Sequence, residues 1–207
     1  QRLGDTVTIG MAYRALGQAE FSLGKFRAAA AHLQISLNTG RQSGHYNLTM
    51  DSLTGLGYLA LAQNEPREAS TYTQQALEVF QELQIDCVNP LAGVWLLIGR
   101  VMLVKEVDEK AEQFFLKTLH ANGRSAWEAM DALAGLAEVH ARRESDSAAK
   151  MLTTVANSTA TADVTRQRVP LIVERFQLPV MPSRRVKKAM FSIDRSFQTL
   201  ALQIESK

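Results

Sequence analysis

The sequence predicts an all-α fold: a right-handed superhelical solenoid of antiparallel helix hairpins, with about four repeats followed by C-terminal capping helices. Three observations predict this class. Strong helix breakers are few, with 12 Gly and only 5 Pro in 207 residues. Small residues recur at fixed offsets in four successive stretches of the chain. In the first stretch, two glycines stand where a helix pair needs a close contact and a turn.

The recurring pattern starts from a small residue that follows Leu or Ile, which we call the anchor. The anchors are Gly17, Gly57, Gly99 and Ala137, and they lie 40, 42 and 38 residues apart. Small residues also stand twelve and nineteen positions after every anchor. After the fourth anchor, both of these residues are alanines. Antiparallel helices approach most closely where side chains are smallest, so we expect each anchor to face the small residue twelve positions later.

The four units are predicted to be helix pairs that together form a repeat array over residues 1–160. The first unit pairs about 5–23 with 25–39, the second 45–63 with 66–84, the third 90–105 with 108–122, and the fourth 125–142 with 145–159. Gly24 stands seven positions after its anchor, in the predicted turn, where glycine readily adopts positive φ. Pro66 suits the first position of the helix that it opens.

Residues 161–207 are predicted to form basic C-terminal helices. A ninth helix is expected over 162–176, broken by Pro170 or starting near it, followed by a linker with two prolines over 177–183. A long helix is expected over 183–205, where apolar residues recur every three or four positions at Val186, Met190, Ile193, Phe197, Leu200 and Ile204. This apolar stripe either caps the array or joins two copies of the chain as a homo-oligomer.

The motifs of individual units resemble a known repeat family. Unit one reads Tyr13, Leu16-Gly17, Gly24, Phe26 and Ala29, and unit three reads Trp95, Ile98-Gly99, Ala111 and Phe115. Over roughly residues 8–160 this pattern resembles the tetratricopeptide repeat family. The spacing of about 40 residues departs from the common 34, and the extra residues fall between units, at 38–47, 83–90 and 120–127. The resemblance implies a non-enzymatic scaffold for protein–protein interaction.

Units with this longer period also resemble the sensor arrays of large bacterial signal-transduction ATPases and LuxR-type transcription activators. Residues 132–156 are similar to the last repeats of those regulators. That resemblance implies roles in signal transduction and transcription regulation. The chain lacks a G-x-x-x-x-G-K-[ST] loop and opens with Gln1, so we expect it to be the sensor or scaffold portion of a longer protein.

The tetratricopeptide resemblance also implies a concave groove for a protein, peptide or small signal, lined by the first helix of each unit. The family's offsets from the anchor, and the turn before them, select Arg14, Gln18, Phe21, Asp51, Thr54, Tyr58, Leu61, Leu96, Arg100, Leu103, Asp131, Ala134, Glu138 and Ala141. The arginines would hold carboxylate or carbonyl oxygens of a ligand. Alternatively, Arg14 and Arg100 pair with the acidic groove residues of neighbouring units.

The sequence offers no catalytic, cofactor or metal site, so we expect no enzymatic activity. No two of the four histidines are three or four residues apart, and Cys87 is the only cysteine. A single cysteine forms no intrachain disulfide, which favours a cytoplasmic location. The longest apolar stretch, residues 94–99, is too short to span a bilayer, so no membrane partner is expected.

Charge is distributed unevenly along the chain. Residues 1–160 hold 14 Lys/Arg and 17 Asp/Glu, a balance of −3, whereas 161–207 hold 9 and 4, a balance of +5. A possible anion or nucleic-acid contact is the basic cluster Arg184, Arg185, Lys187 and Lys188. No aromatic platform accompanies these cations, so we do not expect nucleic acid to be a partner of this chain.

Overall fold

A computed structural model describes residues 3–82, 91–121, 125–161 and 163–179 of the chain. Within these ranges the chain forms nine helices and no strand, which confirms the all-α fold class. The helices are α1 Leu3–Ser22, α2 Phe26–Ser43, α3 Tyr46–Ala62, α4 Pro66–Glu82, α5 Leu91–Val104, α6 Asp108–His120, α7 Ala126–Arg142, α8 Ser147–Asn157 and α9 Asp163–Phe176.

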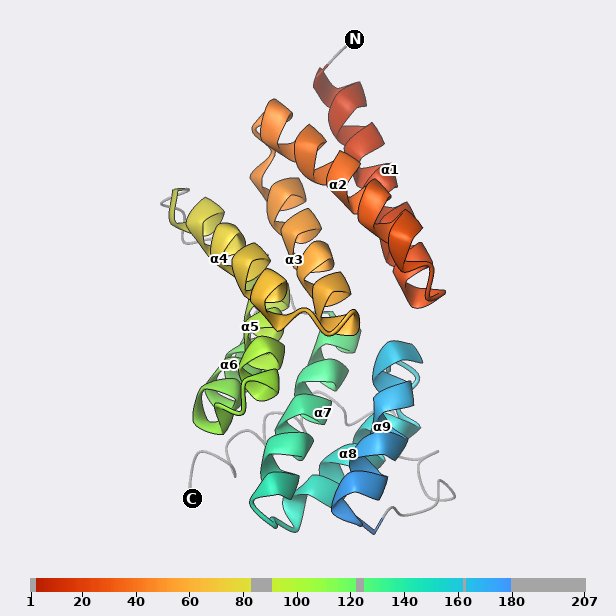
Figure 1. Cartoon of the computed structure of the whole chain (residues 1–207), viewed down its shortest axis with the longest axis vertical. Helices are drawn as coiled ribbons and strands as arrows, with labels where there is room; N and C mark the ends of the chain where they lie inside the picture. Colours follow the sequence, from red (N-terminus) through yellow and green to blue (C-terminus); the bar gives the residue numbers. More distant parts are fainter. Residues whose placement is uncertain (1–2, 83–90, 122–124, 162, 180–207) are drawn as a thin grey trace.

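The helices pack as successive hairpins, α1–α2, α3–α4, α5–α6 and α7–α8 (Figure 1). Each second helix also packs against the first helix of the next unit. The first helices form a continuous row, because α3 contacts α1 and α5, and α7 contacts α5 and α9. The connection between units one and two is shorter than the predicted segment 38–47. The reason is that α2 continues to Ser43, and Gly44 ends it in the left-handed conformation.

All four hairpin turns have the same backbone geometry. The residue seven positions after each anchor has a positive φ: Gly24 at 72°, Asn64 at 61°, Glu106 at 59° and Glu144 at 55°. The next residue then donates its N–H to a carbonyl five positions earlier, as from Lys25 to Glu20 at 2.9 Å. This is the Schellman arrangement that ends many helices, and it satisfies carbonyls that the helix leaves unpaired.

These turns give a first testable prediction. A side chain with a Cβ in the left-handed region costs roughly 1 kcal/mol relative to glycine. We therefore expect Gly24→Ala to lower the free energy of unfolding by about 1 kcal/mol, and Glu106→Gly to raise it by a similar amount, in urea denaturation. Gly24 has no atom near the position of a new Cβ, so steric overlap would not contribute. Opposite signs would show that the turns do not control stability in this way.

Neighbouring units are joined by large side chains that insert between small ones. The ring of Phe115, sixteen positions after its anchor, lies between Gly99 of α5 and Gly135 of α7. Leu33 occupies the same position in unit one, between Gly17 of α1 and Gly55 of α3. A Cβ on Gly99 would lie 2.6 Å from the Phe115 ring, and one on Gly17 would lie 2.7 Å from Leu33. Glycine is therefore required at these sites for close packing.

At the three glycine anchors the atoms nearest to the Cβ position belong to large side chains, and the small residue twelve positions later supplies one of the three nearest atoms only at Gly17. Gly17 lies against the backbone of Ala29, with its Cβ position 3.2 Å from the Ala29 carbonyl. The atoms nearest to Gly57 and Gly99 instead belong to Leu97 and Phe115. The physical reason is that a small anchor leaves a depression that a large side chain from a neighbouring helix fills, which excludes more water than two small residues in contact.

The ninth helix ends in the same way as the four first helices. Gln177 has a φ of 51°, and Leu178 donates its N–H to Val173 at 3.1 Å. Pro170 lies inside α9, so the expectation that this proline breaks or begins the helix is wrong. By its contacts with α7 and α8, α9 takes the place of the first helix of a fifth unit. The predicted helix 183–205 and the cluster Arg184–Lys188 lie outside the described residues.

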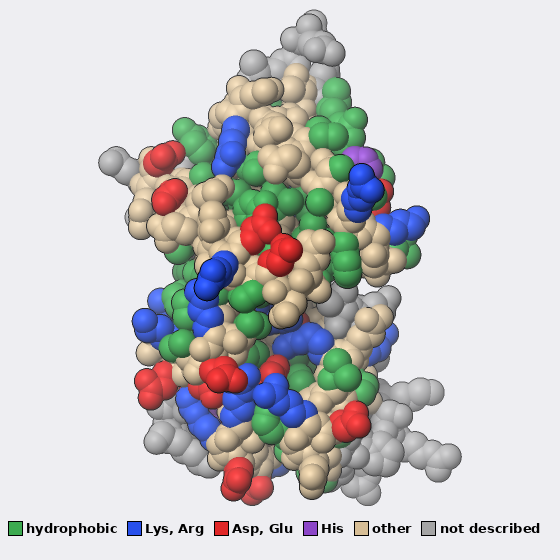
Figure 2. Space-filling model, viewed as in Figure 1, with side chains coloured by type: hydrophobic (Ala, Val, Ile, Leu, Met, Phe, Trp, Pro, Cys, Tyr) green, Lys and Arg blue, Asp and Glu red, His purple; other side chains and the backbone are tan. Residues whose placement is uncertain are grey.

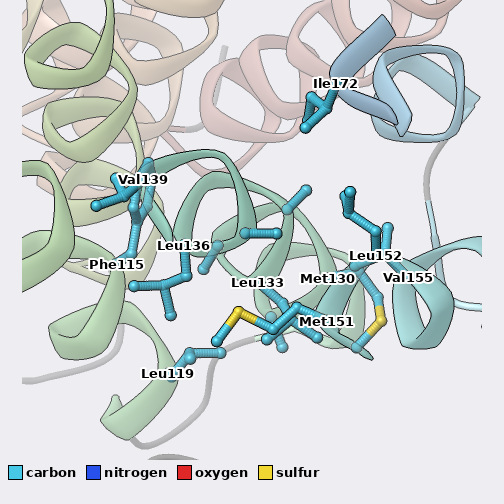
Figure 3. Packing of buried hydrophobic residues seen from close by; sticks show 14 of the residues in the cluster. Phe115, Leu119, Met130, Leu133, Leu136, Val139, Met151, Leu152, Val155 and Ile172 are labelled. Atoms are coloured by element: carbon cyan, nitrogen blue, oxygen red, sulfur yellow. The ribbon is translucent and has the colours of Figure 1, made fainter. Parts of the chain in front are cut away.

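Within the part of the chain that the structure describes, buried apolar residues form three clusters along the stack. The largest joins α5 to α9, with Phe115 and Leu136 fully buried and Ile172 contributed by α9 (Figure 3). A second cluster links the first three units through Leu33, Leu53 and their neighbours. Because α9 shares the largest core, the face of α7 that a fifth unit would cover is already occupied.

Candidate binding face

Two groups of predicted groove residues differ in exposure. The first group, which we call the α1–α3 face, consists of Arg14, Gln18, Phe21, Asp51 and Thr54. Arg14 donates to the side-chain amide oxygen of Gln18 at 3.1 Å, and its Nε lies 3.7 Å from the Asp51 carboxylate. The side chains of Arg14 and Asp51 remain 29% and 45% exposed. This long, solvated ion pair contributes little stability, so both charges are available to a ligand.

The remaining two residues of the α1–α3 face supply apolar contact area. Phe21 is half-buried, and its ring centroid lies 5.9 Å from that of Phe26. Thr54 is half-buried and donates its hydroxyl to the Met50 carbonyl at 2.8 Å, and its methyl group lies next to Gly93 of α5. The face therefore presents an acid, a base, an amide and an aromatic ring on two adjacent helices.

The second group is centred on Asp131 of α7, whose side chain is only 5% exposed. Arg100 of α5 donates to both carboxylate oxygens of Asp131 at 3.1 Å. From α9, Arg168 and Thr165 each donate to the same carboxylate at 2.9 Å. The predicted alternative of cross-unit pairing therefore describes this pair, with the addition of two partners from α9.

Glu138, about two turns further along α7, extends the same network. Arg168 donates to it at 3.3 Å, and Arg142 and Arg175 each lie 3.7 Å away. Arg142 also binds Asp108 of α6 at 2.7 Å. Acidic and basic side chains lie next to one another over this lower half of the molecule (Figure 2). Since α9 satisfies these groups internally, this part of the row is not an open groove.

Asp51 and Asp131 stand at equivalent positions of their units but differ in the direction of their pKa shifts. Asp51 and Asp131 both stand six positions before their anchors. Burial raises the pKa of Asp51 above its ordinary value, because the single arginine that opposes this effect is Arg14. Burial acts in the same direction on Asp131, but Arg100, Arg168 and the Thr165 hydroxyl outweigh it and hold the pKa of that carboxyl below its ordinary value. The Asp51 carboxylate is thus the less satisfied of the two.

Tyr58 lies between the two groups. Its ring packs edge-on against Trp127 of α7, with centroids 6.4 Å apart. Its hydroxyl is buried without a hydrogen-bond partner among the described residues. Burial, followed by the charge of Asp131, raises the pKa of Tyr58 well above its ordinary value, so the phenol stays protonated. Tyr58 therefore belongs more to the inter-unit packing than to an open face.

Several predicted groove residues are core residues instead. Leu96 and Ala134 are fully buried, and Leu103 and Ala141 are 3% and 4% exposed. All but Ala141 pack in the cluster that contains Phe115. The offsets transferred from the family do not hold for these apolar side chains, because burial in the inter-unit core removes more apolar surface from water than a solvated groove would.

The sequence did not identify Thr165, Arg168 and Arg175 of α9 as partners of the groove acids. One signal was available. The repeat array carries a net charge of −3 and the C-terminal portion +5, as shown by the counts above. Opposite net charges on adjacent parts of one chain indicate intramolecular ion pairing as well as an external anionic partner.

Histidine, cysteine and acidic side chains do not cluster as metal ligands within the described ranges. Among those residues, no group of three or more His, Cys, Asp and Glu could hold a metal ion. His140 binds Ser147 at 2.6 Å and Glu112 at 3.3 Å, and His45 accepts the Leu48 N–H at the start of α3. In the same ranges, every helix is too short or too polar to cross a bilayer.

Residues 8–82 match the family model described as tetratricopeptide repeat. The matched segment comprises the first two hairpins and contains the whole α1–α3 face. It supports the tetratricopeptide repeat resemblance for this part of the chain. Tetratricopeptide repeats generally mediate protein–protein interaction, which is consistent with a non-enzymatic scaffold. No curated protein matches the chain.

Proposed function

We propose that the chain is a non-enzymatic protein-binding domain whose α1–α3 face holds a segment of a protein partner. The contrast between the two halves of the first-helix row carries this proposal. Asp131 and Glu138 are nearly buried and have arginine partners from α9, whereas Arg14 and Asp51 form one long ion pair and stay partly exposed. The open half lies within the segment that matches the tetratricopeptide repeat.

The chemistry of this face favours a segment with charged and apolar groups in alternation. Burial raises the pKa of Asp51 and the charge of Arg14 does not offset this effect, so a lysine or arginine of the partner would stabilise its carboxylate. Arg14 would hold a carboxylate or a backbone carbonyl of the same segment. Phe21 would cover an apolar side chain beside them.

We further propose that the chain serves as the sensor or scaffold portion of a larger cytoplasmic regulator. The unit spacing of about 40 residues and the similarity of residues 132–156 to the last repeats of LuxR-type activators support this context. Signal transduction and transcription regulation would then belong to other parts of the longer protein.

A binding experiment with defined peptides tests the α1–α3 face. Peptides selected from a random library on the full chain would be titrated by calorimetry against the wild type and against Arg14→Ala/Asp51→Ala. We expect at least tenfold weaker binding by the double variant, since two charge-assisted contacts are lost. Both side chains are partly exposed, so the thermal unfolding temperature should hardly change.

The control is Arg67→Ala/Glu82→Ala, which removes one exposed base and one exposed acid from α4. Its affinity for the selected peptides should equal that of the wild type. Equal affinities of the wild type and Arg14→Ala/Asp51→Ala for every selected peptide would exclude the α1–α3 face as the binding site.

A further inference from the structure

We propose that a cleft between the second and third units binds the apolar face of an acidic amphipathic helix from a protein partner. The cleft has a volume of about 490 Å³ and is bounded by α4, α5 and α6. None of its lining residues belongs to the α1–α3 face, so its occupation is a binding event separate from the one proposed above.

The origin of the cleft lies in one sequence difference between units. Sixteen positions after the anchor, units one and three have Leu33 and Phe115, which insert between the glycines of adjacent units. Unit two has Thr73 at this position. Here the large residue comes from the opposite helix, because Leu97 of α5 fills the space at Gly57. At the junction with α5, α4 therefore lacks the large side chain that units one and three insert at their junctions.

The lining of the cleft is apolar where it is deepest. Ile98 and Val101 of α5 are 4% and 2% exposed and form the floor. Leu77, Met102 and Phe114 are only partly buried and form the walls. Partly exposed apolar side chains in a concave surface gain free energy when a complementary apolar surface covers them.

The charged side chains at the cleft determine which charge its ligand should carry. Lys105 at the end of α5 and Lys110 in α6 line the cleft and are exposed. Within the described ranges neither forms an ion pair, and no acidic residue lines the cleft, although Glu106 and Glu109 are sequence neighbours. Basic side chains border the hydrophobic surface where α4 meets α5 and α6 (Figure 2). Carboxylates flanking an apolar helix face would pair with both lysines, whereas a basic helix would be repelled.

Two fluorescein-labelled peptides test this assignment by fluorescence anisotropy with the full chain. One is an amphipathic helix of about 16 residues with leucines on one face and glutamates beside them, and the other has lysine in place of each glutamate. We expect the wild type to bind the acidic peptide and not the basic one. Lys105→Glu/Lys110→Glu should bind the acidic peptide at least tenfold more weakly and gain affinity for the basic one.

Two further variants separate the cleft from general electrostatic attraction. Lys25→Glu/Lys150→Glu makes the same change in net charge at exposed positions outside the cleft, and it should retain wild-type affinity. Gln74→Trp places a large side chain on the exposed edge of the cleft and should block binding without altering the circular dichroism spectrum. Failure of the wild type to bind the acidic peptide, equal binding of both peptides, or unchanged binding by the cleft variants would overturn the assignment. Peptides that require Arg14 and Asp51 would still report on the α1–α3 face.

Discussion

Phe115→Ala is expected to lower the free energy of unfolding by about 3–5 kcal/mol, which is the usual cost of removing a fully buried phenylalanine. The ring is fully buried and fills the space between Gly99 and Gly135, and neither glycine has a side chain that could move into the cavity. Since the ring joins the third unit to the fourth, the loss should affect both hairpins together. Urea denaturation followed by circular dichroism would measure it.

Phe115→Leu is the matched control, because Leu33 fills the equivalent space in unit one. This substitution keeps an apolar side chain of related shape and should cost no more than about 1.5 kcal/mol. Gly135→Ala should be strongly destabilising in the wild type, because a Cβ there would overlap the Phe115 ring, and much less so in the Phe115→Ala background. Additive effects of the two substitutions would contradict direct packing between these residues.

The helix hairpins could be predicted from the sequence because each was specified locally. Glycine or a polar residue stands seven positions after every anchor, and all four of these residues have positive φ in the structure. The helix bounds follow from these turns. The contacts of Gly57 and Gly99 could not be predicted, because the pattern of small residues does not show which helix supplies the large side chain that fills each depression. That choice depends on volumes summed over two units.

The candidate site was less predictable, for a related reason. Cross-unit pairing was the predicted alternative for Arg100, and Arg100 donates to Asp131, but the sequence pattern does not specify whether the groove is open. Whether the groove is open along α5 and α7 depends on α9. This helix is far from α5 in sequence, and its Arg168 donates to Asp131. Pro170 also made α9 appear discontinuous, although the helix runs through it. A proline removes one hydrogen bond and does not exclude a helix that tertiary packing supports.

Under the proposed function, one half of the first-helix row stabilises the fold and the other half binds the partner. Buried, multiply bonded charges hold α5, α7 and α9 in fixed positions, whereas the exposed pair on α1 and α3 contributes little to folding. Substitutions of Arg14 and Arg100 should therefore differ in kind. Arg14→Ala should affect binding, and Arg100→Ala should mainly destabilise the fold, since it leaves part of the Asp131 carboxylate without a donor.

Asp131→Ala is expected to lower the free energy of unfolding by about 3–5 kcal/mol, because it leaves Arg100 and Arg168 buried without their shared carboxylate. Burial and the charge of Arg100 lower the pKa of Arg168, so this arginine depends on Asp131 and Glu138 for compensation. Hydrogen exchange should accelerate throughout α9, since Arg168 and Thr165 attach that helix to α7. Exchange in α1 and α2 should be unchanged.

The pH dependence of the free energy of unfolding separates the effect of the Asp131 charge from the effect of the side chain's shape. Because the folded-state pKa of Asp131 lies below the ordinary 3.8, its ion pairs stabilise the fold fully above that value. This stability is lost as the pH falls from about 4 through the lower folded-state pKa. Asp131→Asn keeps the shape and lacks this titration, so its stability should fall less steeply than that of the wild type between pH 5 and pH 2. Parallel pH profiles for the two proteins would show that the carboxylate charge does not hold α9 in place.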